Sequence, residues 1–406
     1  MAQNHHFLNR REFLTGVGAT ACVAMLPRKG MAAAAKEEIP VLAGYQPSVS
    51  AIWVPKGEHE KAFLLFKKMI ESATDFSWLS KGDSIFLKLA LNSGNPYPAT
   101  TDPWHLWAII KILKEKGAGR ILIGDQSGAE HVHWTVSDKK GSSRELCKTA
   151  GLLKVAEENG AEPCFYEERG YDAYFPAMPS GSHYWKKPIF LPNVLKEVQH
   201  LIFLPRVSSH ILSDATLGMK VGVGFLREDS RREFHEGGKD FYAMYEEINW
   251  VPEISSKLRL IVSSGRSVIA VGGPDRGYVV EPDHGLMFAS QDLLTHELLA
   301  YAWLKWGREQ APAQIPVPNR PDLGNVRDLT KRRSEFNKQF VARTWYPQGG
   351  SEVQGIDLYQ PGDVYDHPSI QNHLKRKGRP EKINLVQLNK NPDPEVGDYL
   401  KMQIKV

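Results

Sequence analysis

Short apolar runs alternate with amphipathic segments through most of the chain, and this alternation constrains the fold more than any other feature. Residues 84–91 (SIFLKLAL) and 120–125 (RILIGD) have the length and composition of buried strands. Between them, residues 103–117 (PWHLWAIIKILKEKG) begin with proline and end with glycine, as helices often do. Strands that alternate with helices form βαβ units, so we expect an α/β fold with a largely parallel sheet flanked by helices.

The alternation continues to about residue 310. Further helices are expected over 59–72, 142–160 and 291–306, further strands over 162–166, 201–204 and 258–263, and only a lead-in before Trp53. Residues 311–322 are rich in proline, and turn residues are frequent in the remainder. We therefore expect an α/β domain over 36–310, followed over 311–406 by a Pro-rich linker and a turn-rich extension that wraps on the domain.

The N-terminus carries the pattern of an export signal. Arg10 and Arg11 precede an apolar run, 16–26, and a small-residue stretch, 31–35, follows it. The paired arginines resemble those of twin-arginine (Tat) signals. Eleven apolar residues cannot cross about 30 Å of hydrocarbon, so we expect cleavage of residues 1–35, no stable membrane span afterwards, and a periplasmic protein exported by the Tat translocase.

Charge and cysteine content limit the possible functions. The net charge is +4, but residues 36–310 carry −3, so the domain itself lacks the basic excess typical of nucleic-acid binding. After cleavage only Cys147 and Cys164 remain, too few to hold an ordinary iron–sulfur cluster, and they could pair or stay free. Tat signals imply folded cargo, often with a cofactor or a bound partner. The cofactor is not identified by the sequence; a divalent metal would need His and carboxylate ligands.

Two short patterns suggest metal or substrate binding. Asp125 ends a predicted strand, and ligands of open α/β sheets bind beyond the carboxyl ends of strands. His131 and His133 are alternate residues, which point the same way in an extended chain and could share one ion. The alternatives are a loop cap for Asp125 and two exposed loop histidines.

The stretch 204–235 is the richest in chemistry-bearing side chains. Arg206, His210, Lys220 and His235 accompany several glycines that let a ligand approach the backbone. Arginine and lysine bind carboxylates and phosphates, and histidine exchanges protons near neutral pH. We expect His210 and Lys220 to be catalytic, Arg206 to bind an anionic substrate, and Asp125, His131, His133 and His235 to be candidate metal ligands. The alternative is a mobile basic loop. A glycine-rich turn, 272–277, is expected at the rim of the site.

These segments, taken in order, resemble the family known as domain of unknown function 362, over roughly residues 80–305. Residues that match its motifs are Lys88, Thr101, Pro103, Gly124, Asp125, Pro205, His210, Thr216, Lys220, Gly273, Pro274 and Asp292. The resemblance implies that Lys88, Thr216, Gly273 and Asp292 join Arg206 in binding substrate. The order of Asp, His and Lys also looks, more distantly, like the nickel-dependent lactate racemase superfamily.

The chain departs from the family pattern at several places. Leu89, Ala90 and Val221 replace motif residues, an expected aspartate is replaced around Ser263–Ser264, and a second late aspartate is His296. Ferredoxin-type cysteine motifs, which many relatives carry, are not found in this sequence. We expect a periplasmic metal- or cofactor-dependent enzyme acting on a small anionic substrate. The alternative is a non-catalytic accessory or maturation partner of a redox complex, with the C-terminal extension docking onto it.

Overall fold

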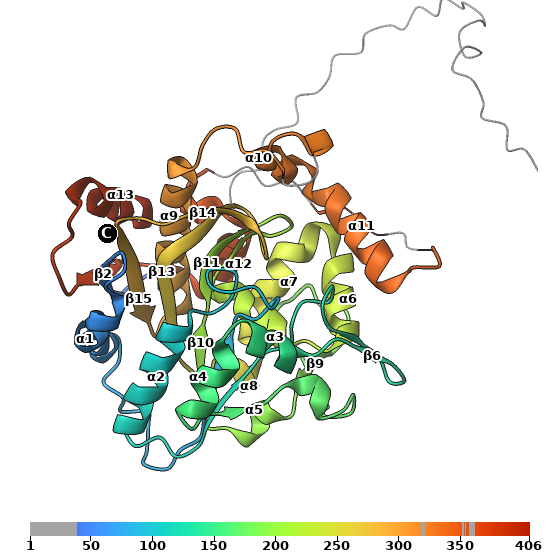
Figure 1. The fold of residues 1–406 in the computed structure, drawn as a ribbon, viewed down its shortest axis with the longest axis horizontal. Helices are drawn as coiled ribbons and strands as arrows, with labels where there is room; N and C mark the ends of the chain where they lie inside the picture. The colour runs from blue at the N-terminus through green and yellow to red at the C-terminus, as the bar shows by residue number, and fades with distance from the viewer. Residues whose placement is uncertain (1–38, 318–320, 351–352, 354, 357–361) are drawn as a thin grey trace, which may run out of the picture. The chain divides into compact units, whose positions relative to one another are not determined.

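A computed structural model shows the expected α/β architecture, a large and mostly parallel sheet with helices on both faces (Figure 1). It describes residues 39–406 except 318–320, 351–352, 354 and 357–361, so the predicted export signal lies outside the described residues. Residues 39–406 form one compact unit.

The main sheet has the strand order β17-β2-β15-β13-β10-β3-β4-β7; in addition, β11 and β14 pair with β13, and β12 pairs with β11. Its strands are β2 (Ser48–Pro55), β3 (Ile85–Leu89), β4 (Ile121–Gly124), β7 (Glu162–Pro163), β10 (His200–Leu204), β11 (Arg206–His210), β12 (Asp214–Thr216), β13 (Leu258–Gly272), β14 (Gly277–Val280), β15 (His284–Ser290) and β17 (Asn384–Gln387). Strands β13, β10, β3, β4 and β7 are parallel, so their carboxyl ends lie at one edge. β15 is antiparallel to both of its neighbours.

Alternate residues of each strand pack into two different cores, as the two-residue period of a strand requires. In β3, Ile85, Leu87 and Leu89 face a core built with α1 (Phe63–Ala73), α2 (Pro103–Glu115), α3 (Ser143–Thr149) and α4 (Leu152–Glu158). Phe86 faces the opposite core, built with α7 (Phe241–Glu247) and α9 (Leu293–Gln310). Lys88 shares the face of Phe86, which places its ammonium group on the α7 and α9 side.

Strands β10 and β11 run in succession along one long partner, β13. Leu201–Phe203 pair with the first part of β13, whereas Arg206 and Ser208 pair with Ser264 and Ile269 further on. Pro205 separates the two strands, since proline has no backbone N–H to donate. Residues 206–210, for which a mobile loop was the alternative interpretation, are thus a buried strand.

Four secondary-structure predictions need correction. The strand expected over 162–166 is only Glu162–Pro163 (β7), and Tyr166–Glu168 form a turn of 3₁₀ helix. The helix expected over 142–160 is two helices, α3 and α4, because Gly151 takes a left-handed conformation (φ 79°) between them. The lead-in expected before Trp53 is β2, a fully paired strand of the main sheet. The strand expected over 258–263 extends to Gly272 as β13.

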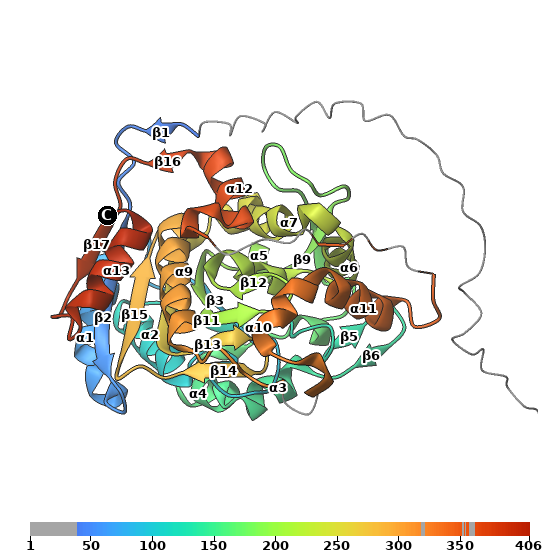
Figure 2. The ribbon, with the colours of Figure 1, turned by 90° about the horizontal axis from the view of Figure 1, so that it is seen from above.

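The C-terminal extension folds onto the domain. Strand β17 pairs with β2, and β1 (Val41–Leu42) pairs with β16 (Arg379–Pro380). Its helices are α10 (Val326–Leu329), α11 (Arg333–Trp345), α12 (Pro368–Lys377) and α13 (Pro394–Ile404). α12 packs on α7, α13 on α9, and α11 lies beside α6 (Glu228–Glu236) (Figures 1 and 2).

The remaining elements are short. They are β5 (His133–Trp134), β6 (Lys139–Lys140), β8 (Tyr174–Ala177), β9 (Ile189–Pro192), α5 (Val194–Glu197) and α8 (Pro252–Ser255), with several single turns of 3₁₀ helix. None of the helices in the described part of the chain combines the length and apolar character that crossing a bilayer requires.

Candidate functional site

A small cavity of about 80 Å³ lies where β3 and β4 end, beside the start of β11. Four basic side chains contribute to its lining, Lys88, Arg206, Lys220 and Arg231, together with His210 and one carboxylate, Asp125. We call this cavity the inner pocket. It lies beyond the carboxyl ends of parallel strands, where open α/β sheets bind their ligands.

Lys88 and Asp125 form a buried ion pair at the base of the inner pocket. Lys88 Nζ lies 2.6 Å from Asp125 Oδ1 and also donates to the Leu89 carbonyl oxygen. Asp125 Oδ2 accepts a hydrogen bond from the Leu91 backbone N–H at 2.7 Å. Gly224 packs against this pair so closely that a Cβ atom there would overlap both charged groups. Backbone groups of Leu89, Leu91 and Gly224 therefore hold the pair in place.

Arg206 and Lys220 have no such partners. Arg206 is only 2% exposed, and its buried Nε and Nη1 atoms have no hydrogen-bond partner. Lys220 Nζ has neither a hydrogen-bonding nor an ion-pairing partner among the described residues. Burial lowers the pKa of Arg206 to about 10. Burial, with the nearby charges of Arg206 and Arg231, holds the pKa of Lys220 well below 10.5.

Lys220 lies on a 3₁₀ helix, Gly218–Phe225, which follows β12. Glu297 of α9 accepts a hydrogen bond from the Met219 backbone N–H at 2.8 Å. The side chain of Asn249 donates to the Met219 carbonyl oxygen at 2.7 Å. These two contacts hold the backbone beside Lys220 from both sides.

His210 ends β11 and lines the inner pocket next to Lys220. Its Nδ1 accepts hydrogen bonds from the backbone N–H groups of Leu212 and Ser213, at 3.1 and 3.3 Å. The proton of the neutral ring is therefore on Nε2, which has no partner among the described residues. Burial and the charges of Lys220 and Arg206 hold the pKa of His210 well below 6.5. A neutral Nε2–H group is thus available as a donor.

The four predicted metal ligands are not brought together. Asp125 is paired with Lys88, His131 Nε2 lies 2.9 Å from Asp275, His133 Nδ1 lies 2.6 Å from Glu228, and His235 Nδ1 lies 3.2 Å from Asn337. His131 and His133 thus contact two different carboxylates, and their sharing of one ion stays a prediction. Within residues 39–317 and the described parts of 321–406, no group of three or more His, Cys, Asp or Glu side chains could hold a metal ion.

The residues expected from the family motifs are divided between the pocket and the scaffold. Thr216 lines the inner pocket, and its hydroxyl is buried without a partner. Gly273 lies against the Ser209 carbonyl with a φ of 80°, in the turn expected at the rim. Asp292 lies outside the pocket lining, where it caps α9 and contacts Lys377 and Tyr45, both at 2.6 Å. Cys147 and Cys164 are buried free thiols.

A second cavity of about 220 Å³, which we call the outer pocket, adjoins the inner pocket. The two share Asn92, His210, Lys220, Val223 and Arg231 in their linings. The outer pocket is closed on one side by α11, which contributes Phe336, Gln339, Phe340 and Arg343. The C-terminal extension therefore forms part of the site.

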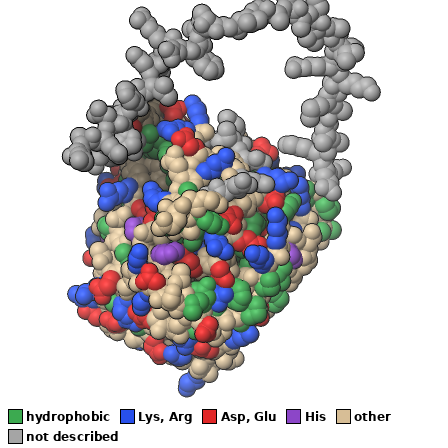
Figure 3. All heavy atoms as spheres, turned by 90° about the vertical axis from the view of Figure 1, so that its right-hand side faces the viewer, with side chains coloured by type: hydrophobic (Ala, Val, Ile, Leu, Met, Phe, Trp, Pro, Cys, Tyr) green, Lys and Arg blue, Asp and Glu red, His purple; other side chains and the backbone are tan. Residues whose placement is uncertain are grey.

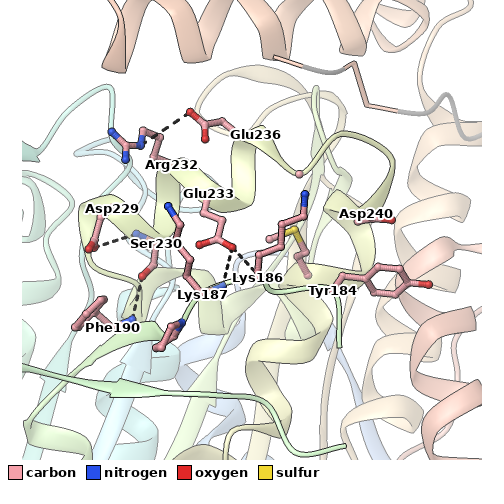
Figure 4. Close-up of a pocket in the computed structure, with 13 residues that line it drawn as sticks. Tyr184, Lys186, Lys187, Phe190, Asp229, Ser230, Arg232, Glu233, Glu236 and Asp240 are labelled. Atoms are coloured by element: carbon pink, nitrogen blue, oxygen red, sulfur yellow. Dashed lines mark hydrogen bonds and ion pairs between the residues drawn. The ribbon is translucent and has the colours of Figure 1, made fainter. Parts of the chain in front are cut away.

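A larger cavity, about 580 Å³, opens on another side of α6 (Figure 4). Its polar groups mostly satisfy one another: Glu233 accepts hydrogen bonds from the backbone N–H groups of Lys186 and Lys187, and Ser230 accepts one from Phe190. On the face that carries α6 and α11, basic and acidic side chains are interspersed (Figure 3). The buried guanidinium of Arg206, with two unpartnered nitrogen atoms, lies instead in the inner pocket beside the half-buried Lys220.

Comparison with known proteins agrees with the motif resemblance. The family described as "Domain of unknown function (DUF362)" matches residues 85–302, more than half of the chain. The chain belongs to the DUF362 family. No curated protein matches the sequence.

Two solved structures resemble the DUF362 chain distantly. A Thermotoga maritima protein is 14% identical with a TM-score of 0.41, over 64% of this chain and 61% of its own. The lactate racemase apoprotein from Thermoanaerobacterium thermosaccharolyticum is 14% identical with a TM-score of 0.37, over 59% of this chain and 54% of its own. The chain thus spans less than two thirds of either protein's length.

Two of the departures from the DUF362 pattern are in contact with each other. Ser263 on β13 and His296 on α9 lie 3.0 Å apart, Oγ to Nε2, in the core. Burial lowers the pKa of His296 to about 3, so the ring is neutral there. A neutral polar pair thus occupies the positions at which the family pattern led us to expect aspartates.

Several residues of the site were not predicted. Arg231 donates to the carbonyl oxygens of Gln126 and Ser127 and so fixes the segment after β4. Asp275 contacts both His131 and Asn92. No local pattern reveals these long-range contacts. The spacing of Phe336, Phe340 and Arg343 does indicate one face of a helix, a signal that the turn-rich composition of the extension obscured.

Proposed function

We propose that this DUF362 protein is an enzyme that binds a small oxyanionic substrate, a carboxylate or a phosphate, between Arg206 and Lys220 in the inner pocket. In this proposal Lys220 transfers a proton to or from the bound substrate, and His210 donates a hydrogen bond to the substrate through its Nε2–H. Lys88, Asp125 and Arg231 position the pocket walls. Thr216 offers a hydroxyl to the anion.

The buried guanidinium of Arg206 is the observation that carries the proposal. An unpaired buried charge costs several kcal/mol, and proteins rarely bury one without a compensating group. Four basic side chains line the inner pocket against one carboxylate, which is already paired with Lys88. A bound oxyanion would supply the compensating negative charge and accept hydrogen bonds from the free N–H groups of Arg206.

Proton transfer follows from the electrostatics of the same pocket. The pKa of Lys220 is lowered by burial and by two neighbouring arginines. An anion placed beside Lys220 reverses part of this effect, because an opposite charge favours the protonated amine. Lys220 can therefore gain a proton when substrate is present and return it later, while the Nε2–H of His210 donates to the substrate.

Isothermal titration with inorganic phosphate and with acetate tests this proposal. Titrations at pH 8 in two buffers of different ionisation enthalpy measure the protons taken up on binding. We expect Lys220→Met to take up fewer protons on binding than the wild type does, and we expect at least tenfold weaker binding in Arg206→Met. Lys148→Met, which removes an exposed lysine, is the control and should behave as the wild type does. Binding of both anions that is unaffected by either pocket variant would contradict the proposal.

We also propose that residues 1–35 direct export to the periplasm. The support is the order of paired arginines, apolar run and small residues. Replacing Arg10 and Arg11 together with lysine should leave the unprocessed protein in the cytoplasm of the native host. Unchanged processing and export of that variant would overturn the assignment of a Tat signal.

A further inference from the structure

We propose that the substrate is an amphipathic anion, with an oxyanion head in the inner pocket and an aromatic or similarly compact apolar group in the outer pocket. This inference rests on the proposed function, because Arg206 and Lys220 are the groups that would bind the head. It adds the chemical class of the substrate, and it assigns the recognition of the substrate's apolar group to the C-terminal extension.

The two pockets are arranged for one ligand with two ends. They share His210, Lys220 and Arg231, so a group bound in the inner pocket lies next to the outer one. The inner pocket, about 80 Å³, is suited to a single carboxylate or phosphate group. An inorganic ion would leave the outer pocket, about 220 Å³, without an occupant.

The outer pocket has apolar walls contributed by four parts of the chain. These walls are Ile211 and Leu212 after β11, Pro274 in the turn after β13, Phe234 of α6, and Phe336 and Phe340 of α11. A dry apolar cavity of about 150 Å³ is enough to bind benzene. The outer pocket is larger than that, so an aromatic ring fits beside these phenyl groups.

α11 is held in place by contacts that leave its phenyl rings facing the pocket. Asn337 is fully buried and donates to the His235 carbonyl oxygen at 2.8 Å. Trp345 Nε1 donates to Glu228 at 2.6 Å. Phe336 and Phe340 remain only partly buried although they flank these anchors. They therefore retain apolar surface that a ligand can cover.

The charged residues of the outer pocket do not offer a second anion site. Arg343 forms an ion pair with Glu130, and both belong to the lining. The unpaired positive charge is confined to the inner end, which fixes the orientation of the ligand with its head inward and its apolar group under α11.

Paired titrations of the mature protein test the inference: phenyl phosphate against inorganic phosphate, and benzoate against acetate. In the wild type we expect the aromatic member of each pair to bind at least tenfold more tightly, which corresponds to about 1.4 kcal/mol. Phe340→Ala should reduce this ratio below threefold and leave the affinity for inorganic phosphate within twofold of the wild type. Phe336→Ala should act in the same direction.

Phe63→Ala is the matched control, because Phe63 is also partly buried but lies on α1, outside both pocket linings. It should keep the wild-type ratio. Equal affinities within each pair in the wild type, or a ratio unchanged in both α11 variants, would overturn the inference. If inorganic phosphate binds in an Arg206-dependent way while the ratio is near one, only this inference fails. If neither phosphate nor acetate binds, the proposed function fails with it.

Discussion

At the scale of single residues, Gly224 shows how closely the inner pocket is packed. A Cβ atom at this position would overlap the carboxylate of Asp125 and the ammonium group of Lys88. Gly224 also accepts a hydrogen bond from the Gln126 backbone N–H, which brings the segment after β4 against the 3₁₀ helix. The absence of a side chain is therefore a requirement of the ion pair.

Gly224→Ala should separate Lys88 from Asp125. Disrupting a buried ion pair typically costs about 3–5 kcal/mol, so we expect a loss of unfolding free energy of this order and weaker phosphate binding. Chemical denaturation and phosphate titration measure the two effects. Gly307→Ala is the control, because a Cβ there meets ordinary contacts at 3.5 Å or more. Equal stabilities of the two variants would contradict this account of Gly224.

His296 predicts a pH-dependent difference in stability. Its pKa is about 3 in the folded protein and near 6.5 when unfolded, so the unfolded state binds the extra proton as the pH falls below about 6.5. Below that pH, protonation of His296 in the unfolded state lowers the free energy of unfolding of the wild type by about 1.4 kcal/mol per pH unit. His296→Gln lacks this loss. When the pH is lowered from 7 to 5, the free energy of unfolding of the variant, measured in denaturant titrations, should therefore rise by about 2 kcal/mol relative to that of the wild type. A difference that stays constant with pH would show that His296 is not buried in its neutral form.

Part of the inner pocket could be predicted from the sequence. Arg206, His210 and Lys220 were found because cationic and small residues are concentrated around them. Asp125 was found because it ends a predicted strand, and Lys88 because it matches a family motif. The contacts of His131 and His133 could not be predicted, because their partners, Asp275 and Glu228, are more than ninety residues away in sequence. A local pattern gives no information on such partners.

At the scale of elements, α11 is the part of the fold on which the account of specificity depends. Asn337 makes two contacts to His235 of α6, one through each atom of its amide group. Because Asn337 is fully buried, its removal leaves unsatisfied polar groups and costs about 1–3 kcal/mol.

Asn337→Ala should loosen α11 without disturbing the sheet. We expect faster amide hydrogen exchange over 333–345 and unchanged exchange in α9. We also expect the variant to lose more affinity for phenyl phosphate than for inorganic phosphate, each compared with the wild type. Hydrogen exchange followed by mass spectrometry resolves the two helices. Unchanged protection of α11 would show that other contacts hold this helix.

At the scale of the whole molecule, the strand–helix alternation was sufficient to predict the α/β class and the parallel centre of the sheet. The alternation did not predict the strands at the β17 edge of the sheet. β17 pairs with β2 although more than three hundred residues separate them in sequence, and β2 was expected to be only a lead-in. The turn-rich composition of the extension likewise concealed α11, whose residues complete the outer pocket. Pairings between distant segments depend on tertiary packing, which local composition does not encode.

A crystal structure of the protein with selenate, an oxyanion whose selenium gives an anomalous signal, tests most directly whether the inner pocket binds an anion. The account predicts an anomalous peak in the inner pocket, with selenate oxygens within hydrogen-bonding distance of the Arg206 guanidinium and Lys220 Nζ. An inner pocket without selenate in crystals that bind the ion elsewhere would contradict the claim that these buried cations form an anion site.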